Sequence, residues 1–190
     1  MKPDPLDPGA SATRHRTPAS SLRYAIAPSD LGYVLIAATP QGLCSVELGD
    51  TPEQLVKQLC RNFPKVRPVE DQAGLSTWMT AVLDCITHPS QQASHANLPL
   101  DMQGTAFQQR VWQALQQIPT GITYTYTQLA EHLGQPASVR AVARACASNR
   151  MAVLIPCHRV IGKDGKLHGY RWGLHRKQAL LAKEAAHFQP

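Results

Sequence analysis

The sequence predicts an α/β first half, with a small antiparallel sheet and helices, followed by a mostly α-helical second half that contains a helix-turn-helix. Three observations predict this: strand-like runs separated by turn signals, helical periodicity further along, and globular composition. The chain has 190 residues, 43% apolar and 17% charged, which suffices to bury a core. We expect a disordered tail or linker remnant at 1–20, a structural domain at 21–97 and a second domain at 98–190.

Three strand-like runs open the first half, at residues 22–27, 33–39 and 43–48. Turn-forming residues separate them at 28–30 and 40–42. Short apolar runs divided by such turns favour an antiparallel meander.

Two helices follow the strands. Thr51 can accept a hydrogen bond as N-cap and Pro52 suits the first helical position, so a helix begins there and ends by Pro64. Apolar spacing predicts a second helix over about 72–87, and a polar connection over 88–99. No chemistry declares itself in this half, so we expect its role to be structural.

The second half begins with a helix capped by Thr105 and reaching Gln117. A short helix over 127–133 and another over 138–148 flank a Gly-Gln-Pro turn. That outline fits a helix-turn-helix, although many helical hairpins share it.

The helix over 138–148 is rich in alanine, with Arg140 and Arg144 as its only long polar side chains. Small side chains allow close packing against another helix. They also suit a narrow nucleic-acid groove, where bulky side chains would collide. The composition leaves both interpretations open.

Positive charge is concentrated near the C-terminus. Residues 140–190 carry ten basic and two acidic side chains, whereas residues 1–139 carry nine basic and eleven acidic ones. Such asymmetry suggests a polyanionic partner, with DNA or RNA foremost, although a solvated basic surface has the same signature.

Several classes are excluded or disfavoured. No apolar run approaches the ~20 residues of a membrane-spanning helix, so no membrane association is expected. A signal-peptide pattern is absent at the N-terminus, and five scattered cysteines fit reduced thiols in a cytoplasmic protein. Their spacing predicts no metal site. Four are expected to be buried structural residues: Cys44, Cys60, Cys85 and Cys146.

The fifth cysteine has a distinctive setting. An apolar run over 151–155 leads into Pro156-Cys157-His158-Arg159-Val160. Neighbouring cationic or hydrogen-bonding groups favour the thiolate, which is the nucleophilic form. Cys157 is therefore a candidate nucleophile, with a buried structural cysteine as the alternative, and His158 could equally be a satisfied core histidine.

The segment around Cys157 resembles the signature of the O6-alkylguanine-DNA alkyltransferases. The resemblance covers roughly residues 20–187, is most specific over 104–184, and is strongest to Ada-type bacterial members. Its motifs are Gly104-Thr105-x-Phe107-Gln108, Val111-Trp112, Ile118-Pro119-x-Gly121, Tyr126-x-x-Leu129-Ala130, Arg140-Ala141-Val142, Asn149, Ile155-Pro156-Cys157-His158-Arg159-Val160-Ile161, Asp164-Gly165-x-Leu167-x-Gly169-Tyr170 and Lys177-x-x-Leu180-Leu181-x-x-Glu184.

The resemblance implies a single-turnover DNA repair methyltransferase with an RNase H-like first domain and a second domain, 98–190, that binds DNA and carries the reactive cysteine. Cys157 would accept the alkyl group from O6-alkylguanine, and also from O4-alkylthymine. His158 would draw off the thiol proton through a water, and Glu184 would orient the imidazole. Asn149 would join the same network, and Tyr170 would give a proton to the purine.

The resemblance also implies a monomer that binds double-stranded DNA through the minor groove without a cofactor. Arg140 would fill the gap left by an extruded base, and Tyr126 would press on the 3′ phosphate. The remaining implied residues lie beside them on the DNA or around the base: Ala141, Arg144 and Ser148 on the DNA, with Met151, Val160 and Arg171 in the pocket wall.

Two positions depart from the family pattern. Arg150 follows Asn149 where many relatives have proline, and Arg171 follows Tyr170 where a small polar residue is common. Both departures bear on which alkyl groups are tolerated. Three other classes remain to be weighed: a lesion-binding protein without an acceptor cysteine, which the presence of Cys157 disfavours; a transcription regulator; and a cysteine hydrolase.

Overall fold

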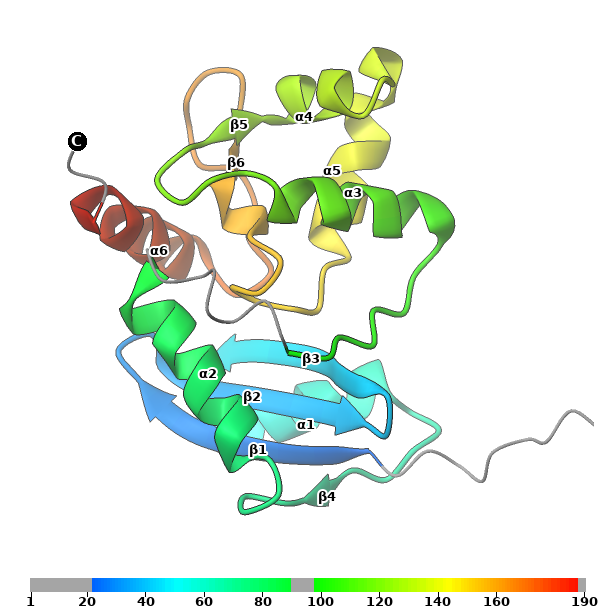
Figure 1. Ribbon diagram of the computed structural model, residues 1–190, viewed down its shortest axis with the longest axis vertical. Helices are drawn as coiled ribbons and strands as arrows, with labels where there is room; N and C mark the ends of the chain where they lie inside the picture. Colours follow the sequence, from blue (N-terminus) through cyan, green and yellow to red (C-terminus); the bar gives the residue numbers. More distant parts are fainter. Residues whose placement is uncertain (1–21, 90–97, 188–190) are drawn as a thin grey trace, which may run out of the picture.

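The computed structural model describes residues 22–89 and 98–187. A four-stranded sheet lies below a group of helices, with α1 and α2 on its opposite faces (Figure 1). The elements of the lower part are β1 (Arg23–Ser29), β2 (Gly32–Thr39), β3 (Gly42–Gly49), α1 (Pro52–Asn62), β4 (Val69–Glu70) and α2 (Ser76–Thr87).

The upper part holds the remaining elements, and its helices stack above the β3 side of the sheet (Figure 1). They are α3 (Ala106–Gln116), β5 (Tyr124–Thr125), α4 (Tyr126–His132), the 3-10 helix η2 (Pro136–Ser138), α5 (Val139–Ala147), the 3-10 helix η3 (Cys157–Arg159), β6 (Val160–Ile161) and α6 (Leu174–His187). The predicted tail at 1–20 and most of the predicted connection at 88–99 lie outside the described residues.

The predicted meander is confirmed. β2 pairs antiparallel with both β1 and β3, and the sheet order is β3-β2-β1-β4. The β2–β3 turn needs Gly42, whose φ is +148° and whose missing Cβ would meet the Pro99 carbonyl oxygen at 2.3 Å. β4 was not predicted, and because it pairs parallel with β1 the sheet is mixed.

The predicted α1 is confirmed, with Thr51 Oγ1 accepting from the Gln54 amide at 3.3 Å and Pro52 in the first turn. Leu55 and Leu59 face the sheet, whereas Cys60 is exposed. The expectation of a buried structural role for Cys60 is therefore wrong: it lies on the outer face of the helix.

Helix α2 ends at Thr87 as predicted but begins at Ser76 rather than 72. The Asp71 carboxylate accepts from the Gly74 amide at 2.8 Å and from Arg23 at 2.8 Å. These bonds hold residues 71–74 in a turn instead of a first helical turn.

Helices α3 and α4 both begin at capping boxes. The pairs are Thr105 with Gln108 and Thr125 with Gln128. In each pair the threonine hydroxyl accepts from the glutamine backbone amide, and the glutamine side chain accepts from the threonine backbone amide. Thr125 therefore starts α4 at Tyr126, one residue before the predicted start. η2 and α5 follow it in close succession.

The two parts join along β3. The Val46 amide donates to the Arg150 carbonyl at 2.7 Å, and the Ala152 amide donates to the Val46 carbonyl at 2.9 Å. One apolar core runs from the α2 face of the sheet through α3, α5 and the Cys157 loop, and a smaller core lies under α1. Within the described residues, no helix is long and apolar enough to cross a membrane.

Candidate active site

Cys157 opens η3, directly after an apolar loop that leaves α5. That loop contains Val153, whose φ of +68° is unusual for a β-branched residue. The Cys157 amide donates to the Ile155 carbonyl at 2.7 Å, which tightens the turn before the thiol. The loop therefore fixes the cysteine on a rigid and locally strained backbone.

Asn149, at the other end of this loop, is fully buried and holds the loop to the sulfur. Its Nδ2 lies 3.2 Å from Cys157 Sγ and 2.9 Å from the Ile155 carbonyl, while its Oδ1 accepts from the Met151 amide at 2.8 Å. An amide donor aimed at sulfur favours negative charge there.

The Cys157 residue is only 7% exposed. Burial raises its pKa to about 11, although the Asn149 hydrogen bond and the Lys177 ammonium act to lower it. In the resting protein this cysteine is a neutral thiol, so its nucleophilic form requires a base.

His158 is the adjacent basic side chain, and it is fully buried. Its Nε2 lies 2.8 Å from Glu184 Oε1. Burial lowers the pKa of His158, although Glu184 opposes this, so the ring is neutral at pH 7. An ionised carboxylate can only accept, so Nε2 carries the proton and Nδ1 bears the free lone pair. Nδ1 is buried and has no hydrogen-bond partner among the described residues.

Glu184 projects from α6 and is held by more than the histidine. Arg159 Nε lies 3.0 Å from its Oε2, Arg159 Nη2 lies 2.9 Å from its Oε1, and the Gly121 amide donates to Oε2 at 3.2 Å. Burial would raise the pKa of Glu184, but the bonds from His158 and Arg159 lower it to about 2. The residue is therefore a carboxylate at any physiological pH.

Arg159, which the sequence indicated only as a cationic neighbour of the thiol, also belongs to the candidate site because it binds Glu184. It is buried and also donates to the Ile118 carbonyl at 2.5 Å and to Thr120 Oγ1 at 3.1 Å. Its place directly after the Cys-His pair was the available signal, but only the fold reveals that its partner is Glu184.

A cavity of about 510 Å³ opens beside the thiol. Its lining residues are Tyr126, Ala143, Cys146, Ala147, Cys157, His168, Gly169, Tyr170 and Arg171. The volume falls in the range of small-molecule sites. Cys146, expected to be purely structural, is buried and also contributes to this wall.

Tyr170 also lines the cavity, and its ring centroid lies 6.4 Å from that of His158. Its hydroxyl is buried and has no hydrogen-bond partner among the described residues. Burial raises its pKa well above 10, so it stays protonated. A buried hydroxyl with an unused proton at a cavity wall is suited to donate to a ligand.

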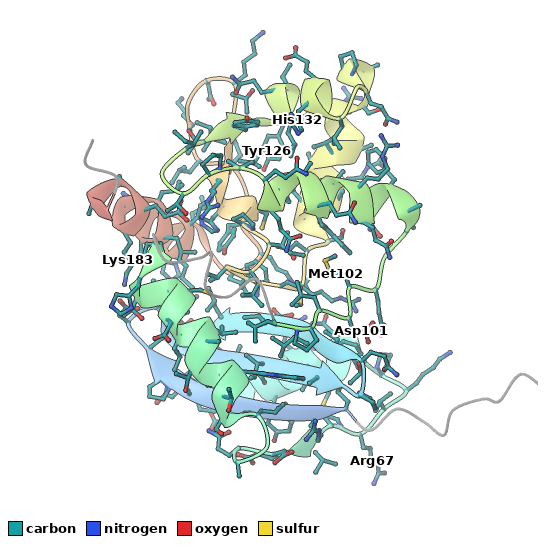
Figure 2. All side chains as sticks on the ribbon, viewed as in Figure 1. Arg67, Asp101, Met102, Tyr126, His132 and Lys183 are labelled. Carbon is teal, nitrogen blue, oxygen red and sulfur yellow. The ribbon has the colours of Figure 1, made fainter. Side chains whose placement is uncertain are left out.

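The predicted DNA-binding residues lie on α4, on α5 and at Ser148, which directly follows α5. Arg140 and Arg144 are exposed, and Ala141 is half-buried on the same helix. Tyr126 begins α4 (labelled in Figure 2) and reaches the cavity wall. The Ser148 hydroxyl is already engaged, since it donates to the Ala145 carbonyl at 2.8 Å and accepts from Gln108 at 3.0 Å.

Of the three predicted pocket residues, Arg171 lines the cavity but Met151 and Val160 do not. Met151 is buried in a bridge to Val46 of β3, and Val160 is buried in β6 beside Tyr124. Both side chains are packed in the main apolar core. Among the described residues, no cluster of three or more His, Cys, Asp or Glu side chains could hold a metal ion.

The chain matches the model of a protein family described as "6-O-methylguanine DNA methyltransferase, DNA binding domain" over residues 106–186. It is 44% identical over 93% of its length to the "Bifunctional transcriptional activator/DNA repair enzyme Ada" of Escherichia coli, and spans 49% of that protein. It thus covers about half the length of such relatives.

A shorter relative is covered almost completely. The "Probable methylated-DNA--protein-cysteine methyltransferase" of Acanthamoeba polyphaga mimivirus is 36% identical over 81% of this chain and 97% of its own length. The crystal structure of Mycobacterium tuberculosis OGT in complex with DNA aligns with a TM-score of 0.70 and 31% identity, covering 86% of this chain and 93% of that one. This chain belongs to the methylated-DNA–protein-cysteine methyltransferase family.

Proposed function

We propose that this chain repairs DNA by transferring the alkyl group of O6-alkylguanine irreversibly to its own Cys157, and that O4-alkylthymine is a further substrate. The observation that carries the proposal is the position of the thiol. It lies at the wall of a cavity large enough for a purine, 3.2 Å from the Asn149 amide, next to a histidine that a buried carboxylate orients.

The reaction needs four protein groups. His158 Nδ1 takes the proton from the Cys157 thiol through a water, and Glu184 stabilises the resulting imidazolium. The sulfur then attacks the alkyl carbon in line with the C–O6 bond, whose electron pair leaves with guanine. Tyr170 donates its hydroxyl proton to the purine as the base departs, so charge never accumulates on the leaving group. The proton that His158 took from the thiol then returns through water to the tyrosine, which leaves both side chains neutral.

The product explains why each molecule acts once. A thioether carbon bears no leaving group that water can displace under these conditions, so Cys157 is not regenerated. The alkyl group arrives already activated on the purine, and the transfer uses only the thiol, the base and the proton donor. A cysteine hydrolase, in contrast, would release its acyl group and turn over.

A base in a duplex stack cannot reach Cys157, so we propose that the target nucleotide is flipped into the cavity. The helices α4 and α5 act as a helix-turn-helix whose α5 enters the minor groove, where its alanines permit close approach. Exposed Arg140 fills the vacated stack and Tyr126 contacts the 3′ phosphate. The exposure of Arg140 and the position of Tyr126 at the cavity rim support these roles.

We further propose that residues 98–190 form the DNA-binding and alkyl-accepting domain, and that the sheet of residues 21–97 is an RNase H-like support. The mixed sheet with a helix on each face is consistent with that assignment. The chain acts as a cytoplasmic monomer on double-stranded DNA. A purely lesion-binding role is disfavoured because the acceptor cysteine is in place.

The test is peptide mass spectrometry after incubation with duplex DNA that contains O6-methylguanine. The peptide with Cys157 should gain one methyl mass, and the Cys157→Ser variant should gain none while still binding the lesion duplex. Methylation of Cys146 in place of Cys157, or no gain on any peptide of the unaltered protein, would contradict the proposal.

A further inference from the structure

A second cavity is lined by β3 and α1 on one side and by the segment that carries Arg171 and Trp172 on the other. It measures about 260 Å³, and we call it the annex. It is bordered by β3 through Glu47, by α1 through Gln54 and Gln58, and by Arg171 and Trp172. Arg171 also lines the cavity of about 510 Å³ beside Cys157, which we call the reaction cavity, and it is the residue that the two linings share.

Residues of the first half of the chain bind Arg171 and Trp172. Arg171 Nη2 donates to Asn62 Oδ1 at 3.0 Å, and Arg171 Nε lies 3.8 Å from Glu47 Oε2. The Trp172 indole N–H donates to the same Glu47 oxygen. Asn62 Nδ2 donates in turn to Glu47 Oε1 at 2.9 Å, so the amide and the carboxylate form one anchor.

The Glu47 carboxylate is held more firmly than the Arg171 side chain that it contacts. The Glu47 side chain is 2% exposed and also accepts from Ser45 at 3.1 Å, which leaves its carboxylate little freedom. The Arg171 side chain is 26% exposed and nothing in its covalent structure keeps a long guanidinium out of the reaction cavity or the annex. Its position therefore depends on the Asn62 and Glu47 contacts.

The anchor also reaches the proton donor. Trp172 is buried, and its ring centroid lies 5.0 Å from that of Tyr170. The interplanar angle of 68° makes this an edge-to-face contact. Loss of the indole hydrogen bond to Glu47 would allow Trp172, and with it Tyr170, to shift.

We propose that Asn62 and Glu47 are positioning residues that set the size of alkyl group accepted at Cys157, because they hold Arg171 as a partition between the reaction cavity and the annex. When the partition is released, the annex joins the cavity, and longer O6-alkyl chains gain room. The sheet-bearing half of the chain thus takes part in substrate selection. This inference rests on the proposed alkyl transfer.

The experiment compares second-order rate constants for two duplexes, one with O6-methylguanine and one with O6-butylguanine. In Asn62→Ala the butyl-to-methyl ratio should rise by about tenfold, the scale on which a pocket discriminates one or two methylenes. The methyl rate itself should fall by no more than about threefold, since no reacting group is touched. A variant that merely weakens DNA binding or folding changes both rates together and leaves the ratio unaltered.

The matched control is Gln54→Ala, which enlarges the annex at a residue that lines it but has no hydrogen bond to Arg171 or Glu47 among the described residues. Its ratio should equal that of the unaltered protein. Arg171→Ala removes the partition itself at a partly exposed site, so it should fold and should raise the butyl-to-methyl ratio, whatever its effect on the methyl rate. In that background Asn62→Ala should have no further effect, because the two residues act through one contact.

An unchanged ratio in Arg171→Ala, or equal effects of Asn62→Ala with and without Arg171, would overturn the inference while leaving methyl transfer intact. Failure of the unaltered protein to take up methyl from its duplex would instead contradict the proposed function. The two failures are distinguished within the same assay.

Discussion

At the scale of single residues, the site depends on a carboxylate that the protein keeps ionised in its interior. Glu184 accepts from His158, Arg159 and the Gly121 amide, and is 1% exposed. A buried carboxylate is tolerated only when such donors replace water. The same bonds that orient the imidazole therefore stabilise the fold.

This coupling predicts a pH-dependent stability. The pKa of Glu184 falls from 4.5 to about 2 on folding, so its contribution is full above pH 4.5 and disappears as the pH falls toward 2. The shift corresponds to about 3 kcal/mol at neutral pH. Glu184→Gln should lose that amount in urea unfolding at pH 7, since Arg159 is left without its counter-charge.

The difference between the two proteins should shrink between pH 4.5 and pH 2. Burial raises the pKa of Glu47, so its effect on the pH dependence of stability has the opposite sign. That effect is the same in both proteins and cancels in the difference between them. A difference that stays constant across this range would contradict the assigned ionisation of Glu184.

A second prediction concerns thiol reactivity. With a pKa of about 11, on the order of one Cys157 in 10⁴ is a thiolate at pH 7. Iodoacetamide should therefore label exposed Cys60 before Cys157, as followed by peptide mass spectrometry. In Cys60→Ser, labelling of Cys157 should remain slow at pH 7 and accelerate as the pH rises toward 11. Fast labelling of Cys157 at neutral pH would show that the resting thiol is already ionised.

At the scale of elements, α5 joins two surfaces: its buried face carries Val142, Ala145 and Cys146, and its exposed face carries Arg140 and Arg144. The buried face allows the close helix packing, and the exposed face allows the close approach to a nucleic-acid groove, that the alanine content suggested. The helix packs against α3, where Trp112 Nε1 donates to the Ala145 carbonyl at 2.9 Å. The arginines are therefore presented by a fixed helix.

Base flipping through α5 predicts a substrate-dependent effect. Arg140→Ala should slow reaction with duplex O6-methylguanine by about tenfold or more, because intercalation offsets an unstacking cost of a few kcal/mol. The slower reaction with the free base O6-methylguanine should be unchanged. Arg144→Ala is the matched control: it should weaken DNA binding and reduce the salt slope by about one, without an effect on the free base. Equal slowing of both reactions by Arg140→Ala would place that residue in the chemistry instead.

The elements that sequence predicts well are those with local signals. Thr51 and Thr105 are N-cap residues that predict where their helices begin, and turn-forming residues predict where the meander strands end. β4, β5 and β6 escape prediction because a two-residue strand has no periodicity and exists only through its partner. The start of α2 was misplaced because Asp71 bonds to the backbone of Gly74, a competition that propensity does not capture.

At the scale of the whole molecule, the site is assembled from distant parts of the chain. α6 brings Glu184 to the Cys157 loop, and α6 is itself tied to the sheet end. Arg176 donates to the Leu31 carbonyl at 2.8 Å, and Lys183, which is labelled in Figure 2, pairs with Asp30. The first half of the chain thus supports the carboxylate, in addition to the Arg171 wall.

This assembly sets the limit of prediction from residues alone. The local composition around Cys157 and His158 could mark the cysteine as a candidate nucleophile, but it left a structural role open for both residues. The roles of Glu184 and Tyr170 were reached only through family resemblance, because no local pattern links them to the thiol. Glu47 and Asn62 gave no signal, since Arg171 and Trp172, which they bind, lie more than a hundred positions away.

The most direct test of the account is a titration of the protein with an excess of duplex DNA containing O6-methylguanine, with counting of the guanines restored. A stable thioether at Cys157 predicts a plateau at one repaired guanine per chain, reached with loss of all further activity. Continued repair beyond one equivalent would show that the sulfur is regenerated, and would contradict the central claim.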